Sequence, residues 1–342
     1  MSNRVLLIHP GPAFSVHDVY VGWREGLEAV GANVATYNLH DRLVFYDRTY
    51  MLVTENQFRK ALTPDQAIEL ATNGVLSACY QFWPDVVVVV TGFLIKATML
   101  DLLRSRGHKV VLIHTEEPYE FEREMGLAAH ADLNLLNDPT HLDRFKEVAP
   151  SIYMPHAYRP QVHCPGPADP EAASDLAFVG TGFPSRIAFL EAMNLAGVDV
   201  ALAGNWQHLT EGSPLRQYLA HPIEECCDNA QGVRLYRATK CGLNLYRREV
   251  EDGGTADGWS VGPREIEMAA TGLFFLRQSR AEGNELFPML PTFTSPDDAS
   301  EQLRWWLTHD DARLVAAGKA RDAIADRTFD RHAAEMLQLV ER

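Results

Sequence analysis

Five valines in a row, Val86-Val87-Val88-Val89-Val90, decide the fold class of this sequence. Branched side chains favour extended backbone, and a strand that is apolar at every position is covered on both faces, as in a parallel sheet. The run is far too short to span a membrane as a helix, which takes about 20 apolar residues. The valines therefore predict a buried strand of a parallel sheet with helices on both sides.

Strand and helix patterns alternate on both sides of this run. Further strands are expected at Arg4–His9, Val34–Tyr37, Val110–His114 and Leu133–Leu136. Helices are expected at Val19–Val30, from Thr63 to about Tyr80, and at Lys96–Arg106, Met125–Ala129 and Thr140–Val148. The stretch 41–56 carries no motif and is expected to form loops. Alternating strands and helices predict a doubly wound parallel sheet.

The same pattern restarts after a proline-rich segment at about residues 157–173, which is interpreted as a linker. Strands are expected at Leu176–Val179, Asp199–Ala203, Gly242–Tyr246 and Leu273–Leu276. Helices are expected at Ser185–Leu195, Ile223–Asn229, Pro263–Thr271, Pro296–Thr308 and Asp311–Asp326. The sequence thus predicts one domain over residues 1–160 and a second over 161–329. A final helix over 330–342, with apolar residues at helical spacing, is expected to pack back on the first domain.

Bulk composition restricts the class of protein. A chain of 342 residues fits two domains. Its net charge is -15, and it has no Lys/Arg run, which disfavours nucleic-acid binding. The N-terminal apolar stretch, Val5–Ile8, is too short for a signal peptide. Five cysteines without zinc-type spacing indicate free thiols, so we expect a cytoplasmic protein with no membrane span and no metal site.

One candidate binding motif is the turn that begins at Gly180 and runs to Arg186, between a predicted strand and a predicted helix. Gly180 and Gly182 would let the backbone approach a ligand, and the helix N-terminus favours an anion. Arg186 could form a bidentate contact with a diphosphate. The alternative is a tight strand-to-helix turn without a ligand, because Ser185 stands where a dinucleotide motif has its third glycine.

A second candidate motif lies on the predicted helix Pro263–Thr271. Arg264 and Glu267 are three residues apart and therefore share a face of that helix. A carboxylate there could accept hydrogen bonds from the adjacent hydroxyls of a sugar. The alternative is an exposed ion pair of no functional importance.

These motifs belong to an ordered set that continues to the C-terminus. The set comprises Arg264, Glu267, Ala269-Ala270-Thr271-Gly272, Leu273–Leu276, Glu285-Leu286-Phe287, Ser295-Pro296-Asp297-Asp298 and Thr328-Phe329-Asp330-Arg331-His332. It resembles the C-terminal half of the glycosyltransferase family that contains the spore maturation protein CgeB, a family of the GT-B type. Upstream, the resemblance includes residues 178–186, 240–247 and 114–119, and it covers most of the chain.

The resemblance implies a GT-B fold, in which two Rossmann-like doubly wound α/β domains face each other across a cleft. It implies a hexosyltransferase-like enzyme that takes a nucleotide sugar without a metal or other cofactor and transfers the sugar to an unidentified protein, glycan or small molecule. Glu267 would bind the donor ribose, and Arg264 would support the nucleotide pocket. Arg186 and Lys240 would neutralise the diphosphate as its charge develops. The oligomeric state stays open.

One position departs from the pattern. Many retaining GT-B enzymes have a second glutamate eight residues before the one that matches Glu267, and here that position is Trp259. The missing glutamate keeps open a non-catalytic protein that binds nucleotide sugars. A sugar-nucleotide epimerase is a further alternative, because some of these enzymes share the GT-B architecture.

The catalytic candidates follow two strands of the first domain. His17 and Asp18 come after the first strand, and His114 and Glu116 come at the end of another. Sugar transfer needs a base for the acceptor hydroxyl unless the leaving phosphate does that work. Two of these residues have structural alternatives. His114 could be a hydrogen-bonded histidine at a strand end, and Asp18 could be the N-cap of the following helix.

Overall fold

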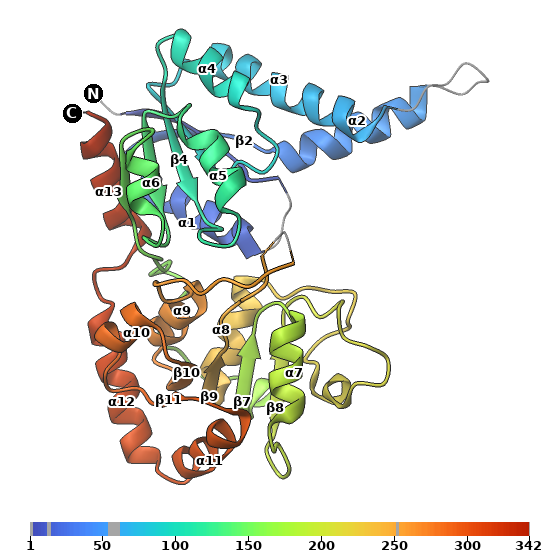
Figure 1. The fold of residues 1–342 in the computed structure, drawn as a ribbon, viewed down its shortest axis with the longest axis vertical. Helices are drawn as coiled ribbons and strands as arrows, with labels where there is room; N and C mark the ends of the chain where they lie inside the picture. Colours follow the sequence, from blue (N-terminus) through green and yellow to red (C-terminus); the bar gives the residue numbers. More distant parts are fainter. Residues whose placement is uncertain (1–2, 12–14, 54–61, 251–252, 342) are drawn as a thin grey trace. The chain divides into compact units, whose positions relative to one another are not determined.

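The structure is a computed structural model that describes residues 3–11, 15–53, 62–250 and 253–341. Contacts divide the chain into two compact units, Met1–Pro155 with Phe329–Arg342 and His156–Thr328. Each unit contains one parallel sheet with helices packed on it (Figure 1). The predicted class, two doubly wound α/β units, is confirmed.

The first unit is built on a six-stranded sheet in the order β2-β1-β3-β4-β5-β6. Its strands are β1 (Arg4–Ile8), β2 (Asn33–Tyr37), β3 (Val86–Val90), β4 (Lys109–His114), β5 (Leu133–Leu136) and β6 (Ser151–Tyr153). Its helices are α1 (Ser15–Ala29), α2 (Leu39–Val53), α3 (Pro64–Phe82), α4 (Ala97–Ser105), α5 (Phe121–Ala128), α6 (Leu142–Lys146) and α13 (Phe329–Val340). The five valines form β3, which is buried throughout and pairs in parallel with β1 and β4.

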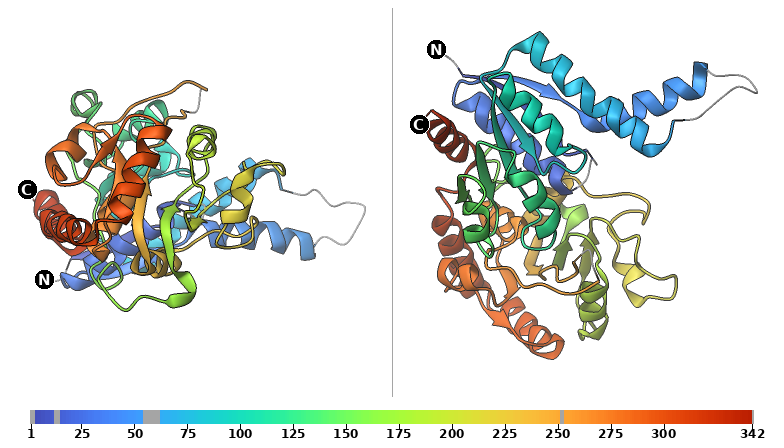
Figure 2. Two further views of the ribbon diagram at one scale, coloured as in Figure 1. Left: turned by 90° about the horizontal axis from the view of Figure 1, so that it is seen from below. Right: turned by 45° about the horizontal axis from the view of Figure 1, so that its top comes forward.

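Two helices of this unit differ from the prediction. Helix α2 occupies part of the stretch expected to form loops and lies beside α3 as a helical hairpin (Figure 2); residues 54–61 lie outside the described part. Helix α1 begins at Ser15, so Asp18 lies in its first turn and is not its N-cap. The predicted start of α3 is confirmed, because the Thr63 side chain accepts a hydrogen bond from the Gln66 N–H.

Helix α13 packs against α1, although the two lie at opposite ends of the sequence (Figure 1). Phe329 places its ring edge-on to Trp23, with 6.1 Å between ring centroids, and Trp23 also contacts the ring of His332. The contact is close because α1 presents glycine here. A Cβ at Gly22 would lie 2.2 Å from the Phe329 ring, and one at Gly26 would lie 2.4 Å from the Phe329 carbonyl oxygen.

We therefore expect Gly22→Ala to destabilise the first unit by about 1–2 kcal/mol. Alanine gains up to about 1 kcal/mol of helix propensity, but overpacking the contact with Phe329 costs about 1–3 kcal/mol. The matched control is Gly126→Ala on α5, where the space around a new Cβ is empty. That variant should be slightly more stable than the wild type. Denaturant unfolding measures both, and a stabilised Gly22→Ala protein would contradict the packing argument.

The second unit contains a five-stranded parallel sheet in the order β11-β10-β9-β7-β8. Its strands are β7 (Ser174–Val179), β8 (Val200–Ala203), β9 (Thr239–Asn244), β10 (Phe275–Gln278) and β11 (Thr292–Phe293). Its helices are α7 (Pro184–Ala192), α8 (Asn229–Ala238), α9 (Pro263–Thr271), α10 (Ala281–Leu286), α11 (Pro296–Leu307) and α12 (Asp310–Ala323). Tyr158 and Thr328 form a parallel bridge, so this unit begins and ends at adjacent positions.

The helix predicted at Ile223–Asn229 is wrong, because that stretch is irregular and α8 begins where it was expected to end. Asp228 is the N-cap, and its side chain accepts a hydrogen bond from the Gln231 N–H. The Gln231 side chain in turn accepts from the Asp228 N–H. This reciprocal pair is a capping box, which starts a helix at a definite residue.

Candidate functional site

The strand order of the second unit reverses at β7, which has β8 on one side and β9 on the other. In open parallel sheets, ligands bind beyond the carboxyl ends of the strands at such a reversal. The turn that contains Gly180 and Gly182 leaves β7 at this edge and leads into α7.

Packing within the unit explains why this turn contains glycine. The Gly180 N–H donates to the carbonyl oxygen of Ala203, the last residue of β8, and the Gly182 N–H donates to that of Asn205, which follows the strand; both distances are 2.8 Å. A Cβ at Gly182 would lie 2.5 Å from the buried ring of Trp206. Gly204 has a φ of +115°, and a Cβ there would lie 2.3 Å from the Gly180 carbonyl oxygen. The two loops can therefore approach each other only because side chains are missing at these positions.

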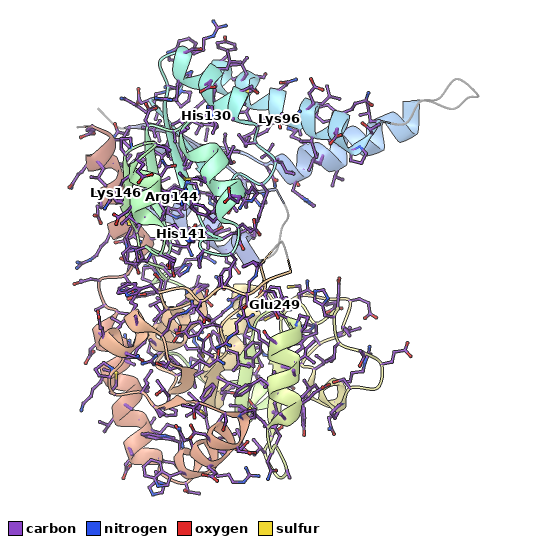
Figure 3. All side chains as sticks on the ribbon, viewed as in Figure 1. Lys96, His130, His141, Arg144, Lys146 and Glu249 are labelled. Carbon is purple, nitrogen blue, oxygen red and sulfur yellow. The ribbon has the colours of Figure 1, made fainter. Side chains whose placement is uncertain are left out.

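A carboxylate lies on the N-terminus of α7. The Ser185 N–H donates a hydrogen bond of 2.9 Å to Oε1 of Glu249, which comes from the segment after β9. Burial tends to raise the pKa of Glu249, but hydrogen bonds from Ser185 and Arg248 outweigh it and hold the pKa below the usual value. Figure 3 labels Glu249 at the end where α7 begins. The helix N-terminus thus already holds one negatively charged group of the chain, as its dipole favours.

Two arginines lie at the same helix end. The guanidinium groups of Arg186 and Arg247 lie 5.2 and 5.1 Å from the centroid of the Phe183 ring, within the range of cation–π contacts. Arg186 also donates to the Thr181 carbonyl oxygen at 3.0 Å, and Arg247 to the Glu249 carbonyl oxygen at 2.9 Å. We call this set the α7 anion site: the first turn of α7 with Arg186, Arg247 and Glu249. Arg247 was not singled out from the sequence.

Arg264 and Glu267 form a buried ion pair of 2.6 Å, in which the side chains are 20% and 7% exposed. The alternative of an exposed pair is therefore wrong. Arg264 also donates to Oδ1 of Asn229, the first residue of α8, at 3.2 Å. Two buried groups, Tyr236 and His163, lie within electrostatic range of the pair. Burial lowers the pKa of His163, which keeps this ring neutral beside Arg264.

Glu265 is a buried carboxyl group that the sequence analysis missed. Its two oxygens accept hydrogen bonds of 2.8 Å from the Gly262 N–H and from the Tyr246 hydroxyl. Burial raises the pKa of Glu265 to about 7. Arg280 lies 3.8 Å above the Tyr246 ring, and both residues follow the carboxyl ends of β9 and β10. The signal in the sequence was a glutamate at the third position of a helix that starts with Gly-Pro.

The structure separates Lys240 from the other predicted binding residues. It is the second residue of β9, and its ammonium group pairs with Asp175, the second residue of β7, at 2.7 Å. Because β7 and β9 are parallel, Lys240 lies at the amino edge of the sheet, opposite the edge where Gly180 leaves β7. Lys240 therefore does not belong to the α7 anion site.

In the first unit, His17 lies in the first turn of α1 with Asp18, close to the carboxyl end of β1. Its Nδ1 is 3.0 Å from Nε2 of His9, a buried histidine that the sequence analysis did not single out. The pKa of His9 is lowered to about 4. Burial of the ring is the largest cause, and the neighbouring His17 and His40 lower the pKa further.

His114 is buried at the end of β4, in agreement with its structural alternative. Its Nε2 lies 2.9 Å from Oδ1 of Asn134, and its Nδ1 lies 3.6 Å from Glu124. A side chain enclosed in this way cannot touch a substrate, so His114 is not a catalytic residue in this arrangement. Glu116 is half-buried, and its N–H donates to Glu124 at 3.1 Å.

Glu117, next to it, is fully buried, and its Oε1 is hydrogen-bonded to Nδ1 of His141. Burial, reinforced by the nearby Glu124 and Asp138, raises the pKa of Glu117 to about 9. Its carboxyl group is therefore neutral in the folded protein at physiological pH.

Comparison with known proteins defines the fold class. Residues 186–338 match the family model described as glycosyl transferase-like. Sucrose-phosphate synthase from Thermosynechococcus elongatus is similar in structure, with a TM-score of 0.67, 13% identity and coverage of 99% of this chain and 98% of that one. The protein therefore has the GT-B fold of glycosyltransferases.

Two further structures have the same fold. Trehalose-6-phosphate synthase OtsA matches with a TM-score of 0.65, 13% identity and coverage of 99% of both chains. A glycosyltransferase from Rickettsia africae matches with a TM-score of 0.63, 10% identity and coverage of 99% and 98%. No curated protein matches the sequence significantly.

None of the described helices has the length and apolar character needed to cross a membrane. Within the described residues, no three His, Cys, Asp or Glu side chains are grouped so that they could hold a metal ion.

Proposed function

We propose that the protein is a glycosyltransferase that binds the diphosphate of a nucleotide sugar at the α7 anion site. The observation that carries the proposal is the carboxylate of Glu249 on the Ser185 N–H, with Arg186 and Arg247 beside it. A helix start next to two guanidinium groups is suited to phosphate oxygens, and the Glu249 carboxylate occupies the position that a phosphate would take by displacing it. The site also lies at the start of the region that matches the glycosyl transferase-like family.

The further details of the proposal rest on the resemblance of the motifs around Arg264 and Glu267 to the CgeB-containing family. We propose that Glu267 accepts hydrogen bonds from the donor ribose and that Arg264 holds its carboxylate in place. The donor would be a nucleotide hexose, used without a metal, and the acceptor is a protein, glycan or small molecule. The free thiols of all five cysteines support action in the cytoplasm.

Titration with a panel of nucleoside diphosphates, and incubation with nucleotide sugars and acceptors, tests this function. Release of nucleotide together with a glycosylated acceptor would support a transferase. A changed sugar on an intact donor would identify an epimerase, and binding without any reaction would identify a binding protein. A failure to bind any nucleoside diphosphate or nucleotide sugar would overturn the proposal.

Substituting one basic residue at each edge of the sheet, Arg247 and Lys240, locates the site. Arg247→Ala should weaken binding of the nucleoside diphosphate by about ten- to a hundredfold, because a hydrogen bond to a charged group is worth about 1.5–3 kcal/mol. Lys240→Ala removes a positive charge at the opposite edge and should leave the affinity unchanged. Isothermal titration measures both variants, and an equal loss in both would show that only net charge matters.

A further inference from the structure

His9 and His17 form a pair of rings at the carboxyl edge of the first unit's sheet. His9 follows β1, and His17 lies in the first turn of α1, which comes after the same strand. The strand order reverses at β1, between β2 and β3, so the pair lies at the position where such sheets bind ligands. Tyr20 packs edge-on against His9, with 4.7 Å between ring centroids, and helps to fix the ring.

A backbone group determines where the protons lie in this pair. The Gly11 N–H donates to Nδ1 of His9 at 3.1 Å. A backbone N–H can only donate, so Nδ1 of His9 carries a lone pair. The low pKa of His9, about 4, means that the ring is neutral at physiological pH, and its single proton must then be on Nε2. That nitrogen lies 3.0 Å from Nδ1 of His17 and donates to it.

The proton on Nε2 of His9 in turn fixes the tautomer of His17. Its Nδ1 accepts from His9, so the neutral His17 ring carries its proton on Nε2. A general base needs a lone pair for the incoming proton, and the lone pair of His17 is already bonded to His9. Protonation at Nδ1 would place two N–H groups against each other.

We propose that His9 is a positioning residue that fixes the tautomer of His17, so that His17 acts on substrate as a hydrogen-bond donor through Nε2 and not as the general base. The group it addresses is an acceptor oxygen, either a sugar hydroxyl or a phosphate. This inference rests on the proposed glycosyltransferase function. If His17 is not the general base, another group must deprotonate the acceptor hydroxyl. Its structural part can be tested without any activity.

Two substitutions at His9 separate its two hydrogen bonds. In His9→Gln, the side-chain amide places an N–H group near the position of Nε2, so the donor to His17 is kept. In His9→Asn, the shorter side chain keeps an acceptor for the Gly11 N–H but cannot reach His17. Both variants replace the ring by a neutral amide, so they form a matched pair.

The test is ¹⁵N NMR of protein labelled on histidine, with the His17 signals assigned by their loss in His17→Asn. In the wild type and in His9→Gln, we expect a lone-pair type shift for Nδ1 of His17 and a protonated type for Nε2. In His9→Asn, the two shifts should move toward each other as the tautomers mix. A wild-type His17 that is protonated on Nδ1, or a mixture of tautomers, would overturn the proposal even if His9→Asn does not fold.

Turnover adds a second measurement. His9→Asn should be slower than His9→Gln by about tenfold or more, since misplaced substrate contacts can cost up to about a hundredfold. Equal turnover in the two variants would overturn the positioning role. Absence of transferase activity in the wild type would refute the proposed function, while the NMR result would still decide the tautomer.

Discussion

Glu267→Gln is expected to weaken binding of a nucleoside diphosphate by about ten- to a hundredfold and to lower stability as well. The loss of affinity follows if the carboxylate accepts charge-assisted hydrogen bonds from the ribose, each worth about 1.5–3 kcal/mol. The loss of stability follows from the structure, because the carboxylate is buried against Arg264 at 2.6 Å. Removing one charge of a buried pair leaves the other without its counter-charge and costs up to about 3–5 kcal/mol.

The matched control is Glu147→Gln. Glu147 pairs with Arg144 at the same i,i+3 spacing, but both side chains are mainly exposed and the distance is 3.9 Å. Exposed pairs contribute little to stability, so this variant should unfold like the wild type and keep its affinity. Isothermal titration and denaturant unfolding of both variants decide the result. A Glu267→Gln protein with reduced stability but unchanged affinity would assign Glu267 to the support of α8 and α9 alone.

Glu117→Gln is expected to stabilise the first unit at alkaline pH. The folded-state pKa of Glu117 is about 9, raised by burial and then by Glu124 and Asp138. An unfolded chain releases the proton of a glutamate near its ordinary pKa of about 4.3. Between these two pKa values the folded state binds more protons than the unfolded state, so stability falls as the pH rises. Glutamine is neutral at every pH and avoids this loss.

At pH 8 the Glu117→Gln variant should be more stable than the wild type by about 4–5 kcal/mol, since about 3.7 pKa units separate pH 8 from the unfolded pKa and each corresponds to about 1.4 kcal/mol. The difference should shrink to about 1 kcal/mol near pH 5. Glu69→Gln, an exposed carboxylate on α3, is the control and should show little difference at either pH. Denaturant unfolding at pH 5, 7 and 8 gives the comparison. A Glu117→Gln protein that is less stable than the wild type at pH 8 would show that Glu117 is ionised and paired.

The sequence predicted the fold class well because the decisive signals are local. Val86–Val90 shows burial on both faces without any knowledge of its neighbours, and Thr63-Pro64 marks a helix start by its own chemistry. The start of α8 was missed although Asp228 and Gln231 carry a comparable signal. Helix α2 had no such signal, and its contact with α3, the next helix along the chain, is visible only in the structure.

The candidate site was less predictable because its residues meet through the fold. Glu249 and Ser185 are 64 positions apart, and nothing near Glu249 marks it as a partner of a helix start. Lys240 was placed with Arg186 on the basis of resemblance, but the parallel pairing of β7 and β9 puts it at the other edge. His9 is visible at the end of a strand, yet its role depends on α1 bringing His17 next to it.

The bridge between Tyr158 and Thr328 has a consequence for the order in which the protein can fold during synthesis. The second unit is one continuous segment, His156–Thr328, inserted into the first. It is therefore complete as soon as Thr328 has left the ribosome. The first unit still lacks α13 at that moment, and the glycine-lined face of α1 has nothing to cover it until Phe329 and the residues after it arrive. Although domains usually fold from the N-terminus onward during translation, here the unit that starts first is the last to be finished.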